Sequence, residues 1–293
     1  MKRIKQIKQI TTLRNLISFF GIIYGTKLFC LRYINRKKYY SILIEKLKNT
    51  FSIDIRKIRS DLNRLPLNKI GSSSKNIWVL WYQGFDTAPK VVKSNLVQLQ
   101  KITRYSKYNI VCLDKNNISK YLKLPDYIIE KVKKGKITLT HLSDIIRAGL
   151  LSQYGGIWLD STCYVKENKF NNINNYIFYT QKYKPGVSSF FNNGKWSGFF
   201  MASGRYNPVE VYLYNMFLIY WKKYDVLVDY FLIDIFLKLG YENISLLKQI
   251  IDSVPFNNSD ILGDEISFKK DTWIKKLNWR KKYDLEYFNK NIK

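Results

Sequence analysis

The chain has 293 residues, of which 46% are hydrophobic and 16% aromatic, so it can bury a sizeable core and a disordered chain is excluded. Its 50 Lys and Arg against 22 Asp and Glu give a formal net charge of +28, which indicates an anionic neighbour such as lipid headgroups, phosphorylated molecules or nucleic acid. The three cysteines, Cys30, Cys112 and Cys163, have no metal-ligand spacing and fit a reducing compartment better than a disulfide framework.

The first 70 residues are predicted to form a basic helical region, with 17 Lys and Arg against 3 Asp and Glu. Residues 13–31 are mostly apolar but are interrupted by Arg14, Asn15 and Lys27, whereas a membrane span needs about 20 apolar residues. The segment also lacks the small-residue cleavage site of a signal peptide. Two interpretations remain: a helix lying in an anionic membrane interface, or an amphipathic helix packed on the rest of the chain.

A domain boundary is predicted after this region. Residues 40–49 and 53–65 have helical patterns, and the sequence Gly-Ser-Ser-Ser-Lys at 71–75 then indicates a loop. We therefore expect a basic helical region, residues 1–70, followed by one domain, residues 71–293.

Strand-like and helix-like segments alternate beyond the loop. Residues 77–82 and 108–113 are short apolar runs, typical of strands buried on both faces. Residues 89–103 and 125–134 have the spacing and end signals of helices. This alternation predicts an α/β fold with parallel strands, in which ligands bind beyond the carboxyl ends of the strands.

The stretch from 138 to 163, TLTHLSDIIRAGLLSQYGGIWLDSTC, holds the only histidine and the only Gly-Gly pair. A helix is expected from Thr140 to Tyr154, ended by Gly155-Gly156, and a strand at 157–159 then leads to Asp160.

Two polar residues of this helix are expected to meet Asp160 at the rim of the sheet. Asp144 and Arg147 are three positions apart and therefore project together. Such a group suits a phosphorylated sugar, because Arg binds anionic or hydroxyl oxygens and carboxylates accept from hydroxyls or bind a divalent cation. Taken alone, an Asp/Arg pair at this spacing is more often a solvated salt bridge.

Several motifs in order resemble the bacterial capsular polysaccharide synthesis glycosyltransferases, relatives of the glycosyltransferases that carry a DxD sugar-binding motif. The resemblance covers about residues 76–280 and is carried by His141-Leu-Ser-Asp144-Ile-Ile-Arg147, Tyr154-Gly155-Gly156-Ile-Trp-Leu-Asp160-Ser-Thr162, Trp78-Val-Leu-Trp81-Tyr-Gln83-Gly84, Lys195-Trp196-Ser-Gly-Phe-Phe-Met201, Asp229-Tyr230-Phe231-Leu-Ile-Asp234 and Lys276-Leu-Asn-Trp279.

The resemblance implies a GT-A fold, a Rossmann-like domain that binds a nucleotide-diphosphate sugar and transfers the sugar to a hydroxyl. By matching positions, Asp144 and Arg147 contact the donor sugar, Asp160 is the first acid of the DxD-like motif, and Trp81 and Gln83 lie where relatives hold the base. The full set of expected donor-binding residues is Trp81, Gln83, Asp144, Arg147, Tyr154, Gly155, Gly156, Asp160, Thr162, Lys276 and Arg280.

The third DxD position is Thr162, whose hydroxyl is a weaker ligand for Mn²⁺ or Mg²⁺ than a carboxylate. A divalent cation at Asp160 and Thr162 is therefore one expectation. The alternative is that Asp160 binds only ribose and sugar hydroxyls, while Lys276 and Arg280 neutralise the leaving diphosphate.

Three residues are candidates for catalysis: Asp160, His141 and Asp234. His141 could contact a substrate or transfer a proton, or simply be bonded at the helix start. Asp229 and Asp234 lie in an apolar segment, where an acid is costly unless it is paired or near a ligand; the resemblance places Asp234 on the acceptor side.

The predicted function is transfer of a sugar, with retention of anomeric configuration, to a lipid-linked or oligosaccharide acceptor of a capsular or other cell-surface polysaccharide. The predicted location is cytoplasmic, peripheral on the inner face of the plasma membrane. Two alternatives stay open: a non-catalytic polybasic protein that binds membranes or nucleic acid, and a degenerate transferase-like scaffold. No basic-aromatic nucleic-acid motif is present, so nucleic acid is not an expected partner.

Overall fold

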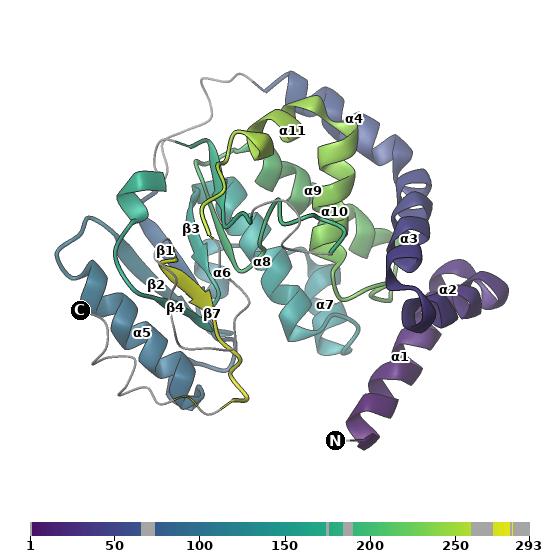
Figure 1. The fold of residues 1–293 in the computed structure, drawn as a ribbon, viewed down its shortest axis with the longest axis horizontal. Coiled ribbons are helices and arrows are strands. Elements are labelled where there is room, and N and C mark those ends of the chain that lie inside the picture. The colour runs from purple at the N-terminus through teal and green to yellow at the C-terminus, as the bar shows by residue number, and fades with distance from the viewer. Residues whose placement is uncertain are drawn as a thin grey trace.

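The computed structural model describes residues 2–65, 74–173, 176–183, 190–258, 272–281 and 283, with side chains from residue 10 onward. The predicted loop at 71–75 lies mostly outside these residues. The described chain forms an α/β fold around a five-stranded sheet (Figure 1). Its strands, in spatial order, are β2 (Asn109–Leu113), β1 (Asn76–Leu80), β3 (Gly156–Leu159), β6 (Phe200–Ser203) and β5 (Phe178–Thr180).

The parallel part of the sheet is the part that the sequence predicted. Strand β1 lies between β2 and β3 and is parallel to both, with Trp78 opposite Val111 and Trp158. Strand β6 is antiparallel to β3, and β5 is antiparallel to β6. Three parallel strands therefore end at one edge, after Leu80, Leu113 and Leu159.

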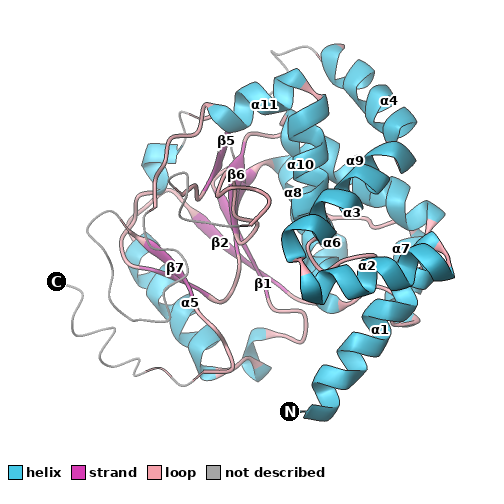
Figure 2. Ribbon diagram, turned by 45° about the vertical axis from the view of Figure 1, so that its right-hand side comes forward, coloured by secondary structure: helices cyan, strands magenta, loops and turns pink. Residues whose placement is uncertain are grey.

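Helices cover both sides of this sheet, with α5 on one side and α8 to α11 on the other (Figures 1 and 2). A small antiparallel sheet of β4 and β7 lies near α5. The elements are α5 (Lys90–Thr103), α6 (Ile118–Tyr121), α7 (Asp126–Lys133), α8 (Leu139–Tyr154), α9 (Pro208–Lys223), α10 (Leu232–Asn243), α11 (Ser245–Asp252), β4 (Cys163–Val165), β7 (Ile274–Lys276) and the short 3-10 helices Phe85–Thr87 and Phe170–Ile173.

The junction of α8 and β3 confirms the predicted glycine stop. The Thr138 hydroxyl accepts from the His141 N–H (3.2 Å) and caps the start of α8. At the other end, Gly155 and Gly156 have φ of 64° and 99°, and a Cβ on Gly155 would lie 2.6 Å from the Ser203 carbonyl oxygen. Only glycine fits this turn, so the chain leaves the helix and enters the sheet within two residues.

The amino-terminal region forms four helices, α1 (Lys2–Phe20), α2 (Ile22–Ile34), α3 (Arg36–Thr50) and α4 (Ser52–Asn63). The apolar segment at 13–31 is therefore two helices, separated at Gly21 (φ 82°). They pack closely, because a Cβ on Gly25 would lie 2.5 Å from the Ile17 nitrogen. No helix in the described part of the chain is both long and apolar enough to cross a membrane.

Helix α1 packs on the rest of the chain. Leu16 is fully buried, the Asn15 amide donates to the Leu227 carbonyl (2.9 Å), and the Phe19 ring stacks on Tyr224 with centroids 4.2 Å apart. The packed interpretation of the amino-terminal segment therefore describes α1. Helix α2 differs, since several of its apolar side chains are exposed.

Asp229, one of the two buried acids singled out in the sequence, connects these helices to the rest of the chain. Its Oδ2 accepts from the Arg32 guanidinium (2.6 Å) and the Tyr39 hydroxyl (2.7 Å), and its Oδ1 accepts from the Phe231 N–H (2.9 Å). Its burial is compensated by pairing with α2 and α3, so no ligand is needed to explain it.

Candidate functional site

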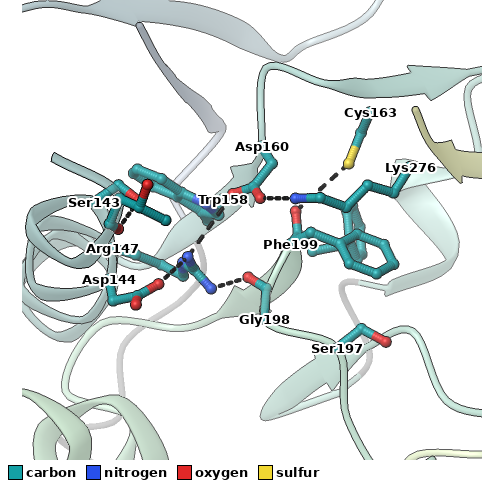
Figure 3. Close-up of polar contacts among 12 residues, drawn as sticks. Ser143, Asp144, Arg147, Trp158, Asp160, Cys163, Ser197, Gly198, Phe199 and Lys276 are labelled. Atoms are coloured by element: carbon teal, nitrogen blue, oxygen red, sulfur yellow. Dashed lines mark hydrogen bonds and ion pairs between the residues drawn. The ribbon is translucent and has the colours of Figure 1, made fainter. Parts of the chain in front are cut away.

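Asp160 lies at the edge where the three parallel strands end, as predicted. Its Oδ1 accepts from the Trp158 indole N–H (2.8 Å) and its Oδ2 from the Lys276 ammonium (Figure 3). Arg147 lies 3.8 Å from Oδ1. Burial alone would raise the pKa of Asp160, but Lys276 and Arg147 outweigh it and lower that pKa. Asp160 is thus a carboxylate held in its ionised form by two cations.

The backbone fixes Asp160 at this position. Its N–H donates to the Phe199 carbonyl (2.9 Å), and its carbonyl accepts from the Cys163 N–H (2.8 Å), which closes a turn over Ser161 and Thr162. Thr162, the third DxD-like position, is buried at 8% exposure, and its carbonyl accepts from the Leu277 N–H (2.9 Å).

Asp144 and Arg147 come from α8 and face this edge. Arg147 donates from Nη2 to Asp144 Oδ1 (2.7 Å) and from Nη1 to the Gly198 carbonyl, and its guanidinium lies over the Trp158 ring at 5.3 Å (Figure 3). The two residues are 7% and 3% exposed, respectively. The solvated salt bridge that the spacing alone suggests is therefore wrong; the pair is buried and directed at Asp160.

Lys276 reaches Asp160 because β7 pairs with β4, with Lys276 opposite Cys163. Its ammonium also lies 5.4 Å from the centre of the Phe199 ring. Burial would lower the pKa of Lys276, but Asp160 outweighs this and raises it, so the side chain stays charged.

Trp81, Gln83 and Arg280 form a neighbouring group rather than part of this cluster. Trp81 is half-buried and its ring meets Trp279 edge to face, with centroids 6.3 Å apart. Arg280 is exposed and lies 4.9 Å from the centre of the same Trp279 ring. Gln83 is exposed at the end of β1. No recorded contact joins Arg280 to Asp160 among the described residues, so only Lys276 of the two cations is placed at the carboxylate.

Tyr154, Gly155 and Gly156, also expected to contact the donor, lie at the opposite end of β3, so the structure does not bring them together with Asp160. They precede β3, whereas Asp160 follows it, and four strand residues at about 3.3 Å each separate the two ends. Gly155 instead accepts from the Trp78 indole through its carbonyl (2.9 Å). Their role is to end α8 and start the strand.

His141 is also placed differently from the expectation of a substrate contact or a proton transfer. It is 2% exposed, and its Nε2 accepts from the Trp221 indole N–H (2.8 Å). Its Nδ1 lies 3.5 Å from Asp144 Oδ2. The buried ring therefore packs between Trp221 and Asp144 and does not face the rim.

Two further carboxyls, the partly buried Asp234 and the buried Glu210, lie near the Asp144–Arg147 pair. Asp234 Oδ1 accepts from the Trp196 indole (3.0 Å) and the Asn192 amide (3.5 Å), and burial raises the pKa of Asp234 to about 7. Glu210 of α9 is fully buried, neither carboxyl oxygen has a hydrogen-bond partner among the described residues, and burial raises its pKa to about 8.

The structure adds three site residues that the sequence did not single out. Trp158 donates to Asp160, Gly198 accepts from Arg147, and the exposed Tyr230 lies within electrostatic reach of Arg147 and Asp160. Trp158 could have been found, because strand residues two apart share a face. Gly198 could not, since its role depends on a carbonyl and on having no Cβ, which would lie 2.7 Å from Arg147 Nη1.

Comparison with known proteins agrees with the resemblance seen in the motifs. Curated relatives include the O-glycosyltransferase PaGT of Phomopsis amygdali, 30% identical over 96 residues, and the O-glycosyltransferase braB of Annulohypoxylon truncatum, 25% identical over 155 residues. The matches cover 30% and 47% of this chain but only 23% and 35% of those relatives. Among solved structures, PaToxG Glycosyltransferase is 15% identical with a TM-score of 0.40, covering 76% of this chain and 83% of that one, which is too distant to support an argument.

The family is shown by a match over most of the chain. The family model described as capsular polysaccharide synthesis protein matches residues 29–290. This range includes the described sheet, α8, Asp160 and Lys276. The chain therefore belongs to the capsular polysaccharide synthesis protein family.

Proposed function

We propose that this chain is a GT-A-type glycosyltransferase that moves a sugar from a nucleotide-diphosphate donor to a hydroxyl acceptor. The observation that carries the proposal is the charged cluster at the carboxyl ends of the parallel strands, in which buried Asp144 and Arg147 meet the partly exposed Asp160 and Lys276. Ligands of open α/β sheets bind at this edge. Family membership and the names of the matched relatives support the same reaction class.

The contacts suggest a role for each part of the site. Asp144 and Arg147 bind hydroxyls of the donor sugar, since the carboxylate accepts and the guanidinium donates. Asp160 binds ribose or sugar hydroxyls, and Lys276, paired with Asp160, binds the diphosphate. Half-buried Trp81, beside Trp279, offers an aromatic face for the base.

Donor turnover tests this proposal. The purified chain is incubated with a panel of nucleotide sugars, such as UDP-glucose, UDP-galactose and GDP-mannose, and nucleoside diphosphate release is measured. We expect release with at least one donor and a loss of about 100-fold or more in Asp160→Ala. Asp61→Ala, an exposed acid on α4, is the matched control. If the chain neither binds nor turns over a donor under any condition, the proposal is wrong. The polybasic binding protein and the inactive scaffold would then remain as the alternatives.

On the acceptor side we propose Asp234 as a residue that orients a hydroxyl of the growing, lipid-linked or oligosaccharide, capsular unit. It lies close enough to Asp144 and Arg147 for their charges to affect its pKa. Asp234→Asn should lower the rate of transfer while leaving the donor affinity within about twofold. A large loss of donor affinity would instead place Asp234 on the donor side.

Retention of anomeric configuration is part of the proposal. The carboxylates Asp144, Asp160 and Asp234 each already accept from a cation or an indole, which disfavours a free base for an inverting displacement. The anomer formed in the first minutes of reaction, read by proton NMR, tests this. An inverted product would require one of these carboxylates to act as the base.

We also propose that α2 rests on an anionic membrane surface on the cytoplasmic side. Ile22, Ile23 and Ile34 are 73%, 84% and 81% exposed. Residues 1–38 carry ten Lys and Arg and no acidic residue. Exposed apolar side chains within a basic segment are typical of interfacial binding.

Liposome flotation of the full chain tests this surface. The variant with Ile22→Ser and Ile23→Ser should lose roughly tenfold or more in affinity for vesicles containing phosphatidylglycerol, because two side chains lose their burial in lipid. Val97→Ser, which removes a branched side chain of α5 that is 63% exposed, should float like the wild type. Equal flotation of all three proteins would contradict the proposal.

A further inference from the structure

We propose that Lys276 acts as a built-in cation at Asp160, in the place that a divalent metal ion takes in DxD-type transferases, so that transfer proceeds without a metal. This inference rests on the proposed glycosyltransferase function. It concerns the charge that stabilises the departing diphosphate. It follows from how two cationic side chains and an indole are arranged around the carboxylate of Asp160.

The residues at this position fit a metal ion poorly. Mg²⁺ and Mn²⁺ are bound by carboxylate and other oxygen ligands. No group of three or more His, Cys, Asp and Glu side chains in the described ranges is placed to hold an ion. Asp160 is the one carboxylate of the DxD-like turn, and the next position that could serve is the hydroxyl of Thr162. One carboxylate with a neutral partner is a weak ligand set.

Both oxygens of that carboxylate are already in use. Oδ1 accepts from Trp158 and Oδ2 from the Lys276 ammonium, while Arg147 lies 3.8 Å from Oδ1. A divalent cation would have to displace an ion pair and would then face two positive side chains at close range. Like charges at such distances repel strongly in a partly buried site. Lys276 and Arg147 therefore exclude a divalent cation from Asp160, both by their charge and by their position.

The position of Lys276 is built into the fold rather than left to a flexible surface chain. Its strand, β7, pairs with β4 in a register that sets Lys276 opposite Cys163. The next residue donates from its N–H to the Thr162 carbonyl (2.9 Å), so the strand is bonded to the DxD-like turn itself. The side chain retains 36% exposure, and a ligand at the rim can contact its ammonium. A preorganised cation of this kind needs no rearrangement when charge develops.

In the chemical step Lys276 stays protonated and neither gives nor takes a proton. The bond between the anomeric carbon and the diphosphate oxygen breaks, and its electron pair remains on that oxygen. The acceptor oxygen forms the new bond to the anomeric carbon, and its proton passes to the released nucleoside diphosphate. Lys276, held by Asp160 on one side, binds the phosphate oxygen that gains charge.

Metal dependence is the direct test and needs no variant. Wild-type turnover should be the same within about twofold in excess EDTA and in millimolar Mn²⁺ or Mg²⁺, and calorimetric titration of Mn²⁺ into the protein should show no saturable binding. Turnover only with added metal would overturn this inference and leave the proposed function standing. No turnover and no binding of UDP or GDP under either condition would remove the proposed function, and this inference with it.

Variants of Lys276 test the residue itself. In EDTA, Lys276→Ala should lose about 100-fold in turnover and most of its affinity for UDP or GDP, whereas Lys276→Arg should retain most of both. Lys120→Ala, which removes an exposed cation of α6, is the control for loss of a surface cation. Thermal unfolding of each variant separates loss of function from loss of fold. Lys276→Ala that is folded and as active as the wild type in EDTA would overturn the proposal.

Discussion

The stability of this protein should fall as the pH rises through neutrality, and Glu210 should be a main cause. Its carboxyl is fully buried, and within the described part of the chain neither oxygen accepts a hydrogen bond. Burial disfavours the charged form and raises the pKa of Glu210 to about 8, although Arg147 opposes this. The folded protein therefore holds the proton more tightly than the unfolded chain does.

The sign and size of the effect follow from linkage. For an acid with a raised pKa, the free energy of unfolding is unaffected below the unfolded pKa and falls as pH rises to the folded pKa. The interval from the ordinary glutamate pKa of 4.5 to about 8, at 1.36 kcal/mol per pH unit, corresponds to roughly 5 kcal/mol. Asp234, whose pKa is raised to about 7, adds a loss of the same sign at lower pH.

Glu210→Gln keeps the shape of the protonated side chain and removes its titration. Urea unfolding followed by tryptophan fluorescence, at pH values from 5 to 9, should show that the variant gains stability relative to the wild type by several kcal/mol across this range. Glu45→Gln, an exposed acid on α3, should give a curve parallel to the wild type. Parallel curves for Glu210→Gln and the wild type would refute the reasoning, because they would show that Glu210 does not take up its proton on folding.

Three further predictions concern contacts on and near the site. Arg32→Ala should lower the free energy of unfolding in urea by about 3 kcal/mol, because it leaves the buried Asp229 without its cation; an unchanged value would mean that the tyrosine hydroxyls suffice. Trp158→Phe should reduce kcat/KM for the donor about tenfold, since Asp160 loses one hydrogen bond, and an unchanged value would make the indole a packing group only. Arg147→Lys should lose donor affinity, measured by calorimetry, nearly as fully as Arg147→Ala, because the single nitrogen of a lysine cannot reproduce the two separate guanidinium nitrogens that bond Asp144 and the Gly198 carbonyl; retention of affinity by the lysine variant would show that charge alone matters.

The local elements could be predicted well because their signals are local. The spacing of apolar residues and the Gly-Gly stop located α8 and β3 to within a residue. The first strand was predicted to end two residues too late, since the apolar run continues into Trp81. In the structure Trp81 accepts from the Gly84 N–H through its carbonyl (2.8 Å), and this turn ends the strand before the hydrophobic pattern ends.

The parts of the site that depend on distant pairing could not be predicted in the same way. Lys276 is 116 positions from Asp160 and meets it only because β7 pairs with β4. Conversely, Gly155 and Gly156 are close to Asp160 in sequence, but an extended strand carries them to the opposite edge. The acid at Asp229 was recognised as needing a partner, and that partner, Arg32, comes from 197 positions away.

The pairing of Asp229 with Arg32 has a mechanical consequence. The next residue, Tyr230, lies within electrostatic reach of Asp144, Arg147, Asp160 and Lys276, so a single short loop is bonded to α2 on one side and lies near this charged cluster on the other. If α2 adsorbs to a membrane and a donor binds at the proposed site, both events act on the loop that carries Asp229 and Tyr230. If the two events are coupled in this way, thermodynamic reciprocity requires that a bound donor change the adhesion of α2 by the same factor. Membrane binding and donor binding would then both depend on the position of the loop at Asp229 and Tyr230.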